Sequence, residues 1–272
     1  MSDSQPATPQ RFRLRLLAAE VTSPVTSFLG AIGDHCMMLG RVVYWGVRPP
    51  YRARQLTDAM AFIGVGSLLI VMLVGLFSGM VTSLQTVNAL RLARAETYAG
   101  SAVGLGLAVE LAPVFTAIML AARAGAGIAT ELGSMRITEQ IDAMATMAVN
   151  PVQYLIVPRV IAGTIVAPLL TIIFFVVGMA GAYFVAVVLM NVDPGVYVAK
   201  FQWLVDPIHL VQGVIKSAVF GLAFTLIACV QGYNASGGAK GVGLATTRAV
   251  VIGCVTILVL DYFLSDILIV VL

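Results

Sequence analysis

Charged residues are scarce in this sequence: Asp, Glu, Lys and Arg make up 11% of its 272 residues, whereas about a quarter of a soluble domain is charged. Hydrophobic residues make up 60%, and the mean hydropathy is +0.98. Apolar runs of the roughly 20 residues that one bilayer crossing needs recur along the chain. The composition therefore excludes a large soluble helical core and predicts an all-α integral membrane protein.

Motifs for nucleotide hydrolysis and hydrolytic catalysis are absent from the sequence. No G-x-x-x-x-G-K-[ST] occurs, and in GGAKGVG (Gly237–Gly243) neither Ser nor Thr follows the lysine. The sequence also contains no H-E-x-x-H, no G-x-S-x-G and no pair of aspartates at useful spacing. A membrane-embedded lipid-modifying enzyme is therefore the weaker alternative, and any ATP-driven work would need a separate ATPase.

Cysteine and histidine are too few and too scattered for a metal site or a disulfide framework. The cysteines are Cys36, Cys229 and Cys254, and the histidines are His35 and His209. We expect the cysteines to be small apolar fillers. The sequence predicts neither a metal nor a cofactor.

The N-terminal region is predicted to stay on the cytoplasmic side. MSDSQPATPQ has no apolar core of a signal peptide, so residues 1–22 are expected to be a disordered cytoplasmic tail. Residues 23–57 are expected to form an interfacial helix and a linker. Ser23-Pro24 is a typical helix start, and apolar residues then recur every three or four positions as far as Val43. Such an amphipathic helix should lie in the membrane interface, and RPPYRAR should end it.

Five membrane spans are predicted in residues 58–272. They lie in the uncharged run between Asp58 and Arg91 and near residues 100–130, 160–192, 210–233 and 246–272. Seven arginines precede the first run, which places the N-terminus in the cytoplasm and the C-terminus outside; these are Arg11, Arg13, Arg15, Arg41, Arg48, Arg52 and Arg54. No motif supports nucleic-acid binding by these arginines. The absence of an internal repeat disfavours a secondary transporter built from two related halves.

A polar stretch, ELGSMRITEQIDAMATMAVNP (Glu131–Pro151), separates the second and third spans. The spacing of its apolar residues predicts a single cytoplasmic helix within Gly133–Val149, about 15 residues and about 22 Å long. Asn150-Pro151 should end the helix, because a residue before proline avoids helical angles. Periodicity leaves two interpretations open: a helix lying on lipid headgroups, or a helix that docks on a cytoplasmic protein.

Several segments, in the same order, resemble the MlaE/YrbE permease family. The polar stretch and its continuation to Gly163 carry the resemblance, together with GLFSGMVTSLQ (Gly75–Gln85), ELAPV (Glu110–Val114), AARAGAGIATELG (Ala121–Gly133) and IKSAVFGLAFTLIACVQGY (Ile215–Tyr233). The resemblance covers nearly all of the chain beyond about residue 50. Many relatives have Arg before the glutamate of the ELAPV-like motif, whereas this chain has Val109. No role of that arginine can be transferred to this chain.

The resemblance implies a membrane subunit of an ABC transporter that moves lipid, for outer-membrane lipid homeostasis, in a bacterial inner membrane. It implies an ABC ATPase (MlaF-like), an MCE-protein ring (MlaD-like) on the outer face, a STAS-domain protein (MlaB-like), a second permease copy, and phospholipid bound between the two copies. Residues 58–272 would be the permease domain. The polar stretch would be the ATPase-coupling helix, with contact residues Glu131, Arg136, Glu139, Gln140, Asp142 and Met144.

Three ionisable residues are predicted inside the membrane, where charge is costly: Glu110, Arg123 and Asp261. For Glu110 a part in the lipid path and a buried structural partner both remain open. For Arg123 we favour a snorkelling or bundle-pairing arginine, and for Asp261 a hydrogen-bonded contact within the bundle.

The outer half of the first span is the candidate lipid pocket. Phe77, Met80, Val81 and Leu84 fall at helical spacing, with Asn88 one turn beyond. This surface could pack against another span. The resemblance favours a groove for acyl chains at the interface between two permease copies.

Overall fold

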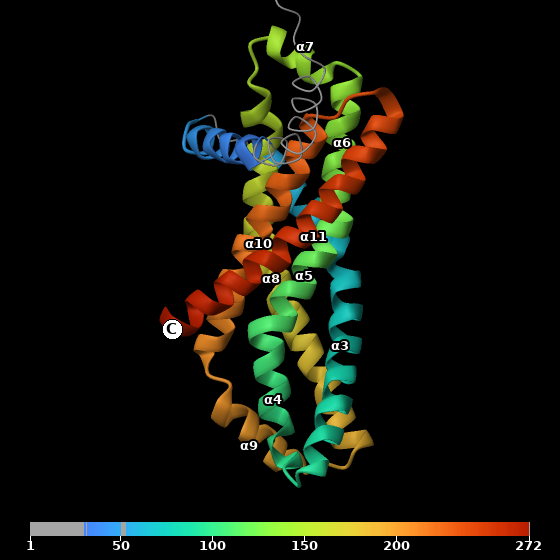
Figure 1. Cartoon of the computed structure of the whole chain (residues 1–272), viewed down its shortest axis with the longest axis vertical. Coiled ribbons are helices and arrows are strands. Elements are labelled where there is room, and N and C mark those ends of the chain that lie inside the picture. Colours follow the sequence, from blue (N-terminus) through green and yellow to red (C-terminus); the bar gives the residue numbers. More distant parts are fainter. Residues whose placement is uncertain (1–29, 31, 50–52, 272) are drawn as a thin grey trace, which may run out of the picture.

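The computed structural model describes residues 30, 32–49 and 53–271. The predicted tail and the predicted helix start at Ser23-Pro24 therefore lie outside the described residues. Within the described part the chain is helical and contains no strand. Residues 32–46 form a helix that crosses one end of the bundle at a large angle to its long axis (Figure 1). Met38 and Val42, one turn apart, are buried, whereas Met37 and Val43 are exposed.

The predicted five spans are confirmed, and most are longer than one bilayer crossing requires. Five helical segments are long and apolar enough to cross a membrane: 53–92, 96–137, 152–189, 207–233 and 238–268. The first contains α2 (Ala53–Ile63) and α3 (Val65–Leu92), the third contains η4 (Val152–Ile156), α8 (Val157–Tyr183) and η5 (Phe184–Leu189), and the fourth and fifth are α10 (Pro207–Tyr233) and α11 (Gly238–Val271). The spans exceed the predicted ranges because helical hydrogen bonding continues into their polar ends.

The second span is a chain of short segments rather than one regular helix. It consists of η1 (Glu96–Tyr98), α4 (Ala99–Gly106), η2 (Leu107–Leu111), α5 (Ala112–Leu120), η3 (Ala121–Gly125) and α6 (Ala126–Ile137). The segments η2 and η3 are π-helical turns, and such turns widen a helix by one residue and often mark functional positions. They flank α5 and carry Glu110 and Arg123.

The spans approach one another closely at paired glycines. Gly79 on α3 faces the backbone of Gly178 on α8, and Gly221 on α10 faces the backbone of Gly163 on α8. At both contacts an added Cβ would lie less than 3 Å from a backbone oxygen. Small residues at such crossings let membrane helices pack backbone to backbone. The helix α8 is therefore the common neighbour that holds α3 and α10 in place.

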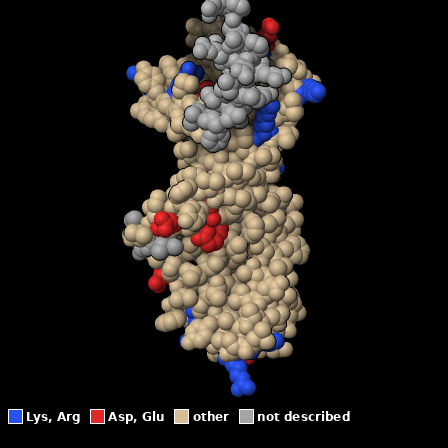
Figure 2. All heavy atoms as spheres, in the orientation of Figure 1, with Lys and Arg blue, Asp and Glu red and all other residues tan. Residues whose placement is uncertain are grey.

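Short helices close the two ends of the bundle. The helix α7 (Gln140–Thr146) joins the second and third spans at one end, and α9 (Pro194–Leu204) lies at the other end, before α10 (Figure 1). Lys and Arg gather at the two ends, and the surface between them is mostly uncharged except for acidic side chains near mid-height (Figure 2). The charge distribution is that of a bundle whose middle lies in hydrocarbon.

The prediction of one helix over Gly133–Val149 is wrong. The second span continues as α6 to Ile137, Thr138 ends it, and Glu139 adopts a left-handed conformation with φ = 60°. The helix α7 then covers only Gln140–Thr146, and Ala148 is also left-handed, with φ = 59°. A left-handed residue breaks the helical hydrogen-bond pattern. Apolar periodicity does not reveal such a break when the residue is not glycine.

Candidate functional site

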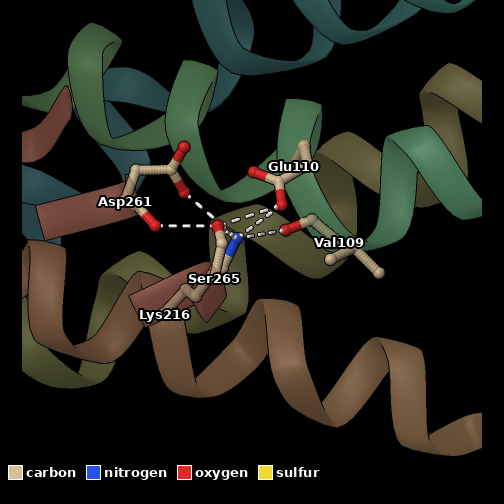
Figure 3. A network of polar contacts seen from close by, with 5 residues as sticks. All are labelled: Val109, Glu110, Lys216, Asp261 and Ser265. Carbon is tan, nitrogen blue, oxygen red and sulfur yellow. Dashed lines mark hydrogen bonds and ion pairs between the residues drawn. The ribbon is translucent and has the colours of Figure 1, made fainter. Parts of the chain in front are cut away.

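A buried lysine has four hydrogen-bonding neighbours (Figure 3). The side chain of Lys216, on α10, is fully buried. Its Nζ lies 2.8 Å from Glu110 Oε1, 3.1 Å from Asp261 Oδ1, 2.7 Å from Ser265 Oγ and 3.1 Å from the carbonyl oxygen of Val109. These four residues and Lys216 are called the Lys216 cluster below. It links the second, fourth and fifth spans.

The local sequence explains why the Val109 carbonyl accepts from a side chain. In an α-helix this oxygen would accept from the backbone N–H four residues later, but that residue is Pro113, which has no N–H. The chain forms the π-turn η2 at this point. The ammonium of Lys216 donates to the freed oxygen. Proline therefore creates the acceptor that helps to bury the lysine.

The cluster carries more negative than positive charge. Lys216 contributes +1 and the carboxylates of Glu110 and Asp261 contribute −1 each, so the formal charges sum to −1. The Glu110 side chain is 43% exposed and that of Asp261 is 20% exposed. A charge inside a membrane costs at least about 2.5 kcal/mol and is normally paired or hydrated. Here Lys216 is paired with two carboxylates, and the Glu110 side chain reaches the bundle surface.

Ser265 connects the Glu110 carboxylate to the backbone of α11. Its hydroxyl lies 3.1 Å from Glu110 Oε1 and 2.7 Å from the carbonyl oxygen of Asp261, one helical turn earlier on α11. The structure therefore brings together Glu110 and Asp261, which the sequence analysis singled out separately. It adds Lys216, to which that analysis assigned no role. The available signal was a lysine in an otherwise apolar run.

Arg123 lies in a different environment, on η3. Its guanidinium donates to the carbonyl oxygen of Phe62 and lies 3.5 Å from Ser67 Oγ, and its Cζ lies 4.8 Å from the centre of the Phe62 ring. These partners belong to α2 and α3, so Arg123 ties the first span to the second. The backbone of Gly66 passes directly beneath the guanidinium, where a Cβ would clash.

At the α7 end, ion pairs fix the segment between the second and third spans. Arg159 on α8 pairs with Glu131 on α6, with 2.7 Å between nitrogen and oxygen. Arg136 pairs with Asp142 across the break between α6 and α7, at 2.6 Å. Because both pairs are partly exposed, each contributes roughly 1 kcal/mol or less to stability. They nevertheless restrict the orientation of α7.

The predicted coupling residues fall into two groups in the structure. Glu131, Arg136 and Asp142 are engaged in these ion pairs. Glu139 and Gln140 are exposed at the tip of the segment, and Gln140 donates to Thr138 Oγ1 at 3.0 Å. Met144 is half-buried. Ile141 is 1% exposed and anchors α7 to the bundle.

The predicted lipid-pocket residues lie on an uncovered face of α3. Phe77, Val81, Leu84 and Asn88 are exposed in the single chain, and Phe77 and Val81 are each 59% exposed. Met80 differs because it is half-buried against Gly181 of α8. The continuous surface therefore consists of Phe77, Val81 and Leu84, with Met80 at its edge.

The model of a family described as Permease MlaE matches residues 56–267. A probable ABC transporter permease protein of Rickettsia felis is 36% identical over 250 residues, covering 92% of this chain and 96% of that protein. The intermembrane phospholipid transport system permease protein MlaE of Haemophilus influenzae is 38% identical over 259 residues, covering 90% of this chain and 98% of that protein.

A plant protein is also similar. The chloroplastic protein TRIGALACTOSYLDIACYLGLYCEROL 1 of Arabidopsis thaliana is 34% identical over 230 residues, covering 85% of this chain and 66% of the plant protein. The residues matched by the family model include the Lys216 cluster, the α6–α7 segment and the exposed face of α3.

Proposed function

Because this chain belongs to the MlaE permease family, we propose that it is the membrane-spanning subunit of an ABC transporter that moves phospholipid between membranes. The main support for this proposal is the match of the family model to residues 56–267, a range that includes nearly all of the five spans. The name of the Haemophilus relative supports phospholipid as the cargo. The sequence has no P-loop, so ATP would be hydrolysed by a separate subunit.

The α7 end of the bundle is proposed to face the cytoplasm of a bacterial inner membrane. The seven early arginines support an N-terminus on that side. With five spans, the C-terminus would then lie on the periplasmic side. An MCE-protein ring would meet the α9 end, and an ATPase, with or without a STAS-domain protein, would meet the α7 end.

The α6–α7 segment is proposed as the docking element for the ATPase. Its exposed tip, Glu139 and Gln140, offers polar contacts, while Ile141 holds α7 on the bundle. The Arg136–Asp142 pair spans the left-handed break at Glu139 and keeps α7 at a fixed angle to α6. A displacement of α7 by the ATPase would therefore be transmitted through α6 to the rest of the second span, which carries Arg123 and Glu110.

Reversing the charge at the tip tests this docking. Glu139→Lys is expected to weaken ATPase binding by roughly threefold to tenfold, because a charge reversal at an interface rim disturbs electrostatic complementarity. The measurement is the fraction of ATPase that stays bound to the purified variant at several salt concentrations. The matched control is Glu96→Lys at the opposite end, where Glu96 forms only an exposed pair with Arg91. Equal ATPase retention by both variants would contradict the assignment.

The uncovered face of α3 is proposed to meet a second permease copy and to line the lipid site between the two. An apolar face that stays exposed in a single chain is typical of a surface completed by lipid or by another subunit. Phe77, Val81 and Leu84 would contact acyl chains, with Asn88 near the lipid headgroup.

Reconstitution tests the proposed function directly. The chain alone is expected to show no vanadate-sensitive ATP hydrolysis, and the complex with its ATPase is expected to hydrolyse ATP and to retain phospholipid detectable by mass spectrometry. Lipid movement between donor and acceptor vesicles should require both ATP and this chain. ATP turnover by the isolated chain, or lipid transfer without it, would refute the proposal.

A further inference from the structure

A groove separates α8 from α9, away from the exposed face of α3. It has a volume of about 390 Å³, and its walls are largely apolar. From α8 come Phe175, Met179 and Tyr183, and from α9 come Tyr197, Phe201 and Gln202. Phe175 and Tyr183 are eight residues apart, so the groove follows α8 for about 12 Å. Its length and apolar walls suit an alkyl chain better than a compact polar ligand.

Tyr197 lines this groove, and its hydroxyl is buried. The residue is 2% exposed, and its hydroxyl has no hydrogen-bond partner among the residues that the structure describes. Its ring is held against the backbone of Gly100 and, edge to face, against Tyr183, with 5.7 Å between the ring centres. Burial raises the pKa of Tyr197 to about 12, so the hydroxyl stays protonated at neutral pH. It is therefore a fixed donor without an acceptor, which is rare in native structures.

The surroundings of the groove are those of a membrane–water interface. On α9, Lys200 Nζ lies 4.5 Å from the centre of the Tyr98 ring and 5.2 Å from that of Trp203, which is 67% exposed. Trp and Tyr with nearby Lys are typical of the headgroup level. Gln202 and Tyr183 are exposed at the groove, whereas Phe175 lies deeper along α8, toward the middle of the bundle. The groove thus changes from polar to apolar in the direction in which a phospholipid does.

We propose that this groove binds one acyl chain of a glycerophospholipid, and that the Tyr197 hydroxyl donates a hydrogen bond to the ester carbonyl of that lipid. The ester carbonyl of a bilayer lipid lies just below the headgroup level. An ester carbonyl can only accept hydrogen bonds, and an acceptor is the group that the buried Tyr197 hydroxyl lacks. The site is distinct from the α3 face. In the proposed topology the groove lies in the outer leaflet, and only this assignment depends on that topology.

A photoactivatable phospholipid tests the site in the full-length chain. The protein is placed in nanodiscs with a phosphatidylethanolamine that carries a diazirine near the carboxyl end of one acyl chain, and cross-linked peptides are located by mass spectrometry. Labelling is expected on residues 175–183 and 197–202. Tyr197→Phe removes only the hydroxyl and should lower this labelling roughly threefold to tenfold, the loss expected for one hydrogen bond. The melting temperature of the lipid-free protein in detergent should be unchanged or higher.

Two tryptophan variants control for position. Ala180→Trp fills the groove and should abolish the labelling, whereas Leu169→Trp, at an exposed position on α8 outside the groove, should leave it unchanged. Equal labelling in wild type, Tyr197→Phe and Ala180→Trp would overturn the proposal. So would cross-linking of a diazirine at position 180 to a partner protein, and not to lipid, in the assembled complex. Neither ATP nor transport enters these measurements, so their failure would leave the proposed function untouched.

Discussion

Lys216→Met is expected to destabilise the bundle by about 3 kcal/mol and to abolish ATP-driven lipid transfer. Methionine fills most of the volume but removes the only cation of the cluster, so the carboxylates of Glu110 and Asp261 face each other without compensation. Breaking a buried ion pair by deleting one partner typically costs about 3–5 kcal/mol. The lower end applies here, because the Glu110 side chain is 43% exposed, so the ion pair is only partly buried.

The melting temperature in detergent and the transfer rate in vesicles measure this effect. The triple variant Lys216→Met, Glu110→Gln, Asp261→Asn removes the uncompensated charges and should recover most of the lost stability. Comparing the single, double and triple variants gives the coupling between the three groups. Lys200→Met makes the same substitution at a partly exposed position on α9 and should change stability by roughly 0.5 kcal/mol or less. A Lys216→Met protein as stable as that control would show that the cluster contributes little to folding.

If the triple variant folds but does not transport lipid, the cluster has a role beyond stability. Glu110 reaches the bundle surface and Lys216 does not, so Glu110 is the member that a lipid or a second copy could contact. Recovery of both stability and transport would instead assign the cluster a purely structural role.

Gly79→Ala is expected to destabilise the protein by about 1–3 kcal/mol. A Cβ at Gly79 would overlap the carbonyl group of Gly178 on α8, and backbone atoms cannot move aside as a flexible side chain can. Overpacking of this kind costs about 1–3 kcal/mol. The separation of α3 from α8 should also reposition the exposed face of α3.

A glycine-to-alanine substitution at Gly106 should have the opposite effect on stability. Nothing lies within 4 Å of a Cβ added at Gly106, and alanine is favoured over glycine in a helix by roughly 0.5–1 kcal/mol. Gly106→Ala should therefore leave the melting temperature unchanged or raise it. Equal effects of the two variants would mean that helix propensity, and not the α3–α8 contact, dominates at both sites.

Sequence reasoning identified the spans because bilayer crossing imposes a length and an apolar composition that a single sequence displays. It placed the start of the third span near residue 160, whereas helical structure begins at Val152. The difference arises because the charged Arg159 ends the uncharged run on which the prediction rested, whereas the helix continues through this residue. The break at Glu139 was missed for a different reason. Glu139 is left-handed, but glutamate is not among the residues that favour this conformation, which are glycine, asparagine and aspartate.

The Lys216 cluster was missed because helical periodicity relates only residues on one helix. Lys216 and Glu110 are 106 positions apart, and Lys216 and Asp261 are 45 apart. One local clue was nevertheless present. Pro113 removes the N–H that would have bonded to the Val109 carbonyl, so the sequence itself signals a free acceptor beside Glu110. The unpartnered hydroxyl of Tyr197 had no such clue, because its burial depends on how α9 folds back against α4.

The depth of the Lys216 cluster exposes it to the membrane voltage. Lys216 is nine residues from the start of α10, about 13 Å along the helix, and the formal charges of the cluster, Lys216 included, sum to −1. A unit charge that crosses the whole membrane at 100 mV exchanges about 2.3 kcal/mol with the electric field, so a crossing of half the thickness exchanges about 1 kcal/mol. The field therefore assists or opposes any displacement of the cluster along the membrane normal. An ionophore that collapses the potential removes that contribution.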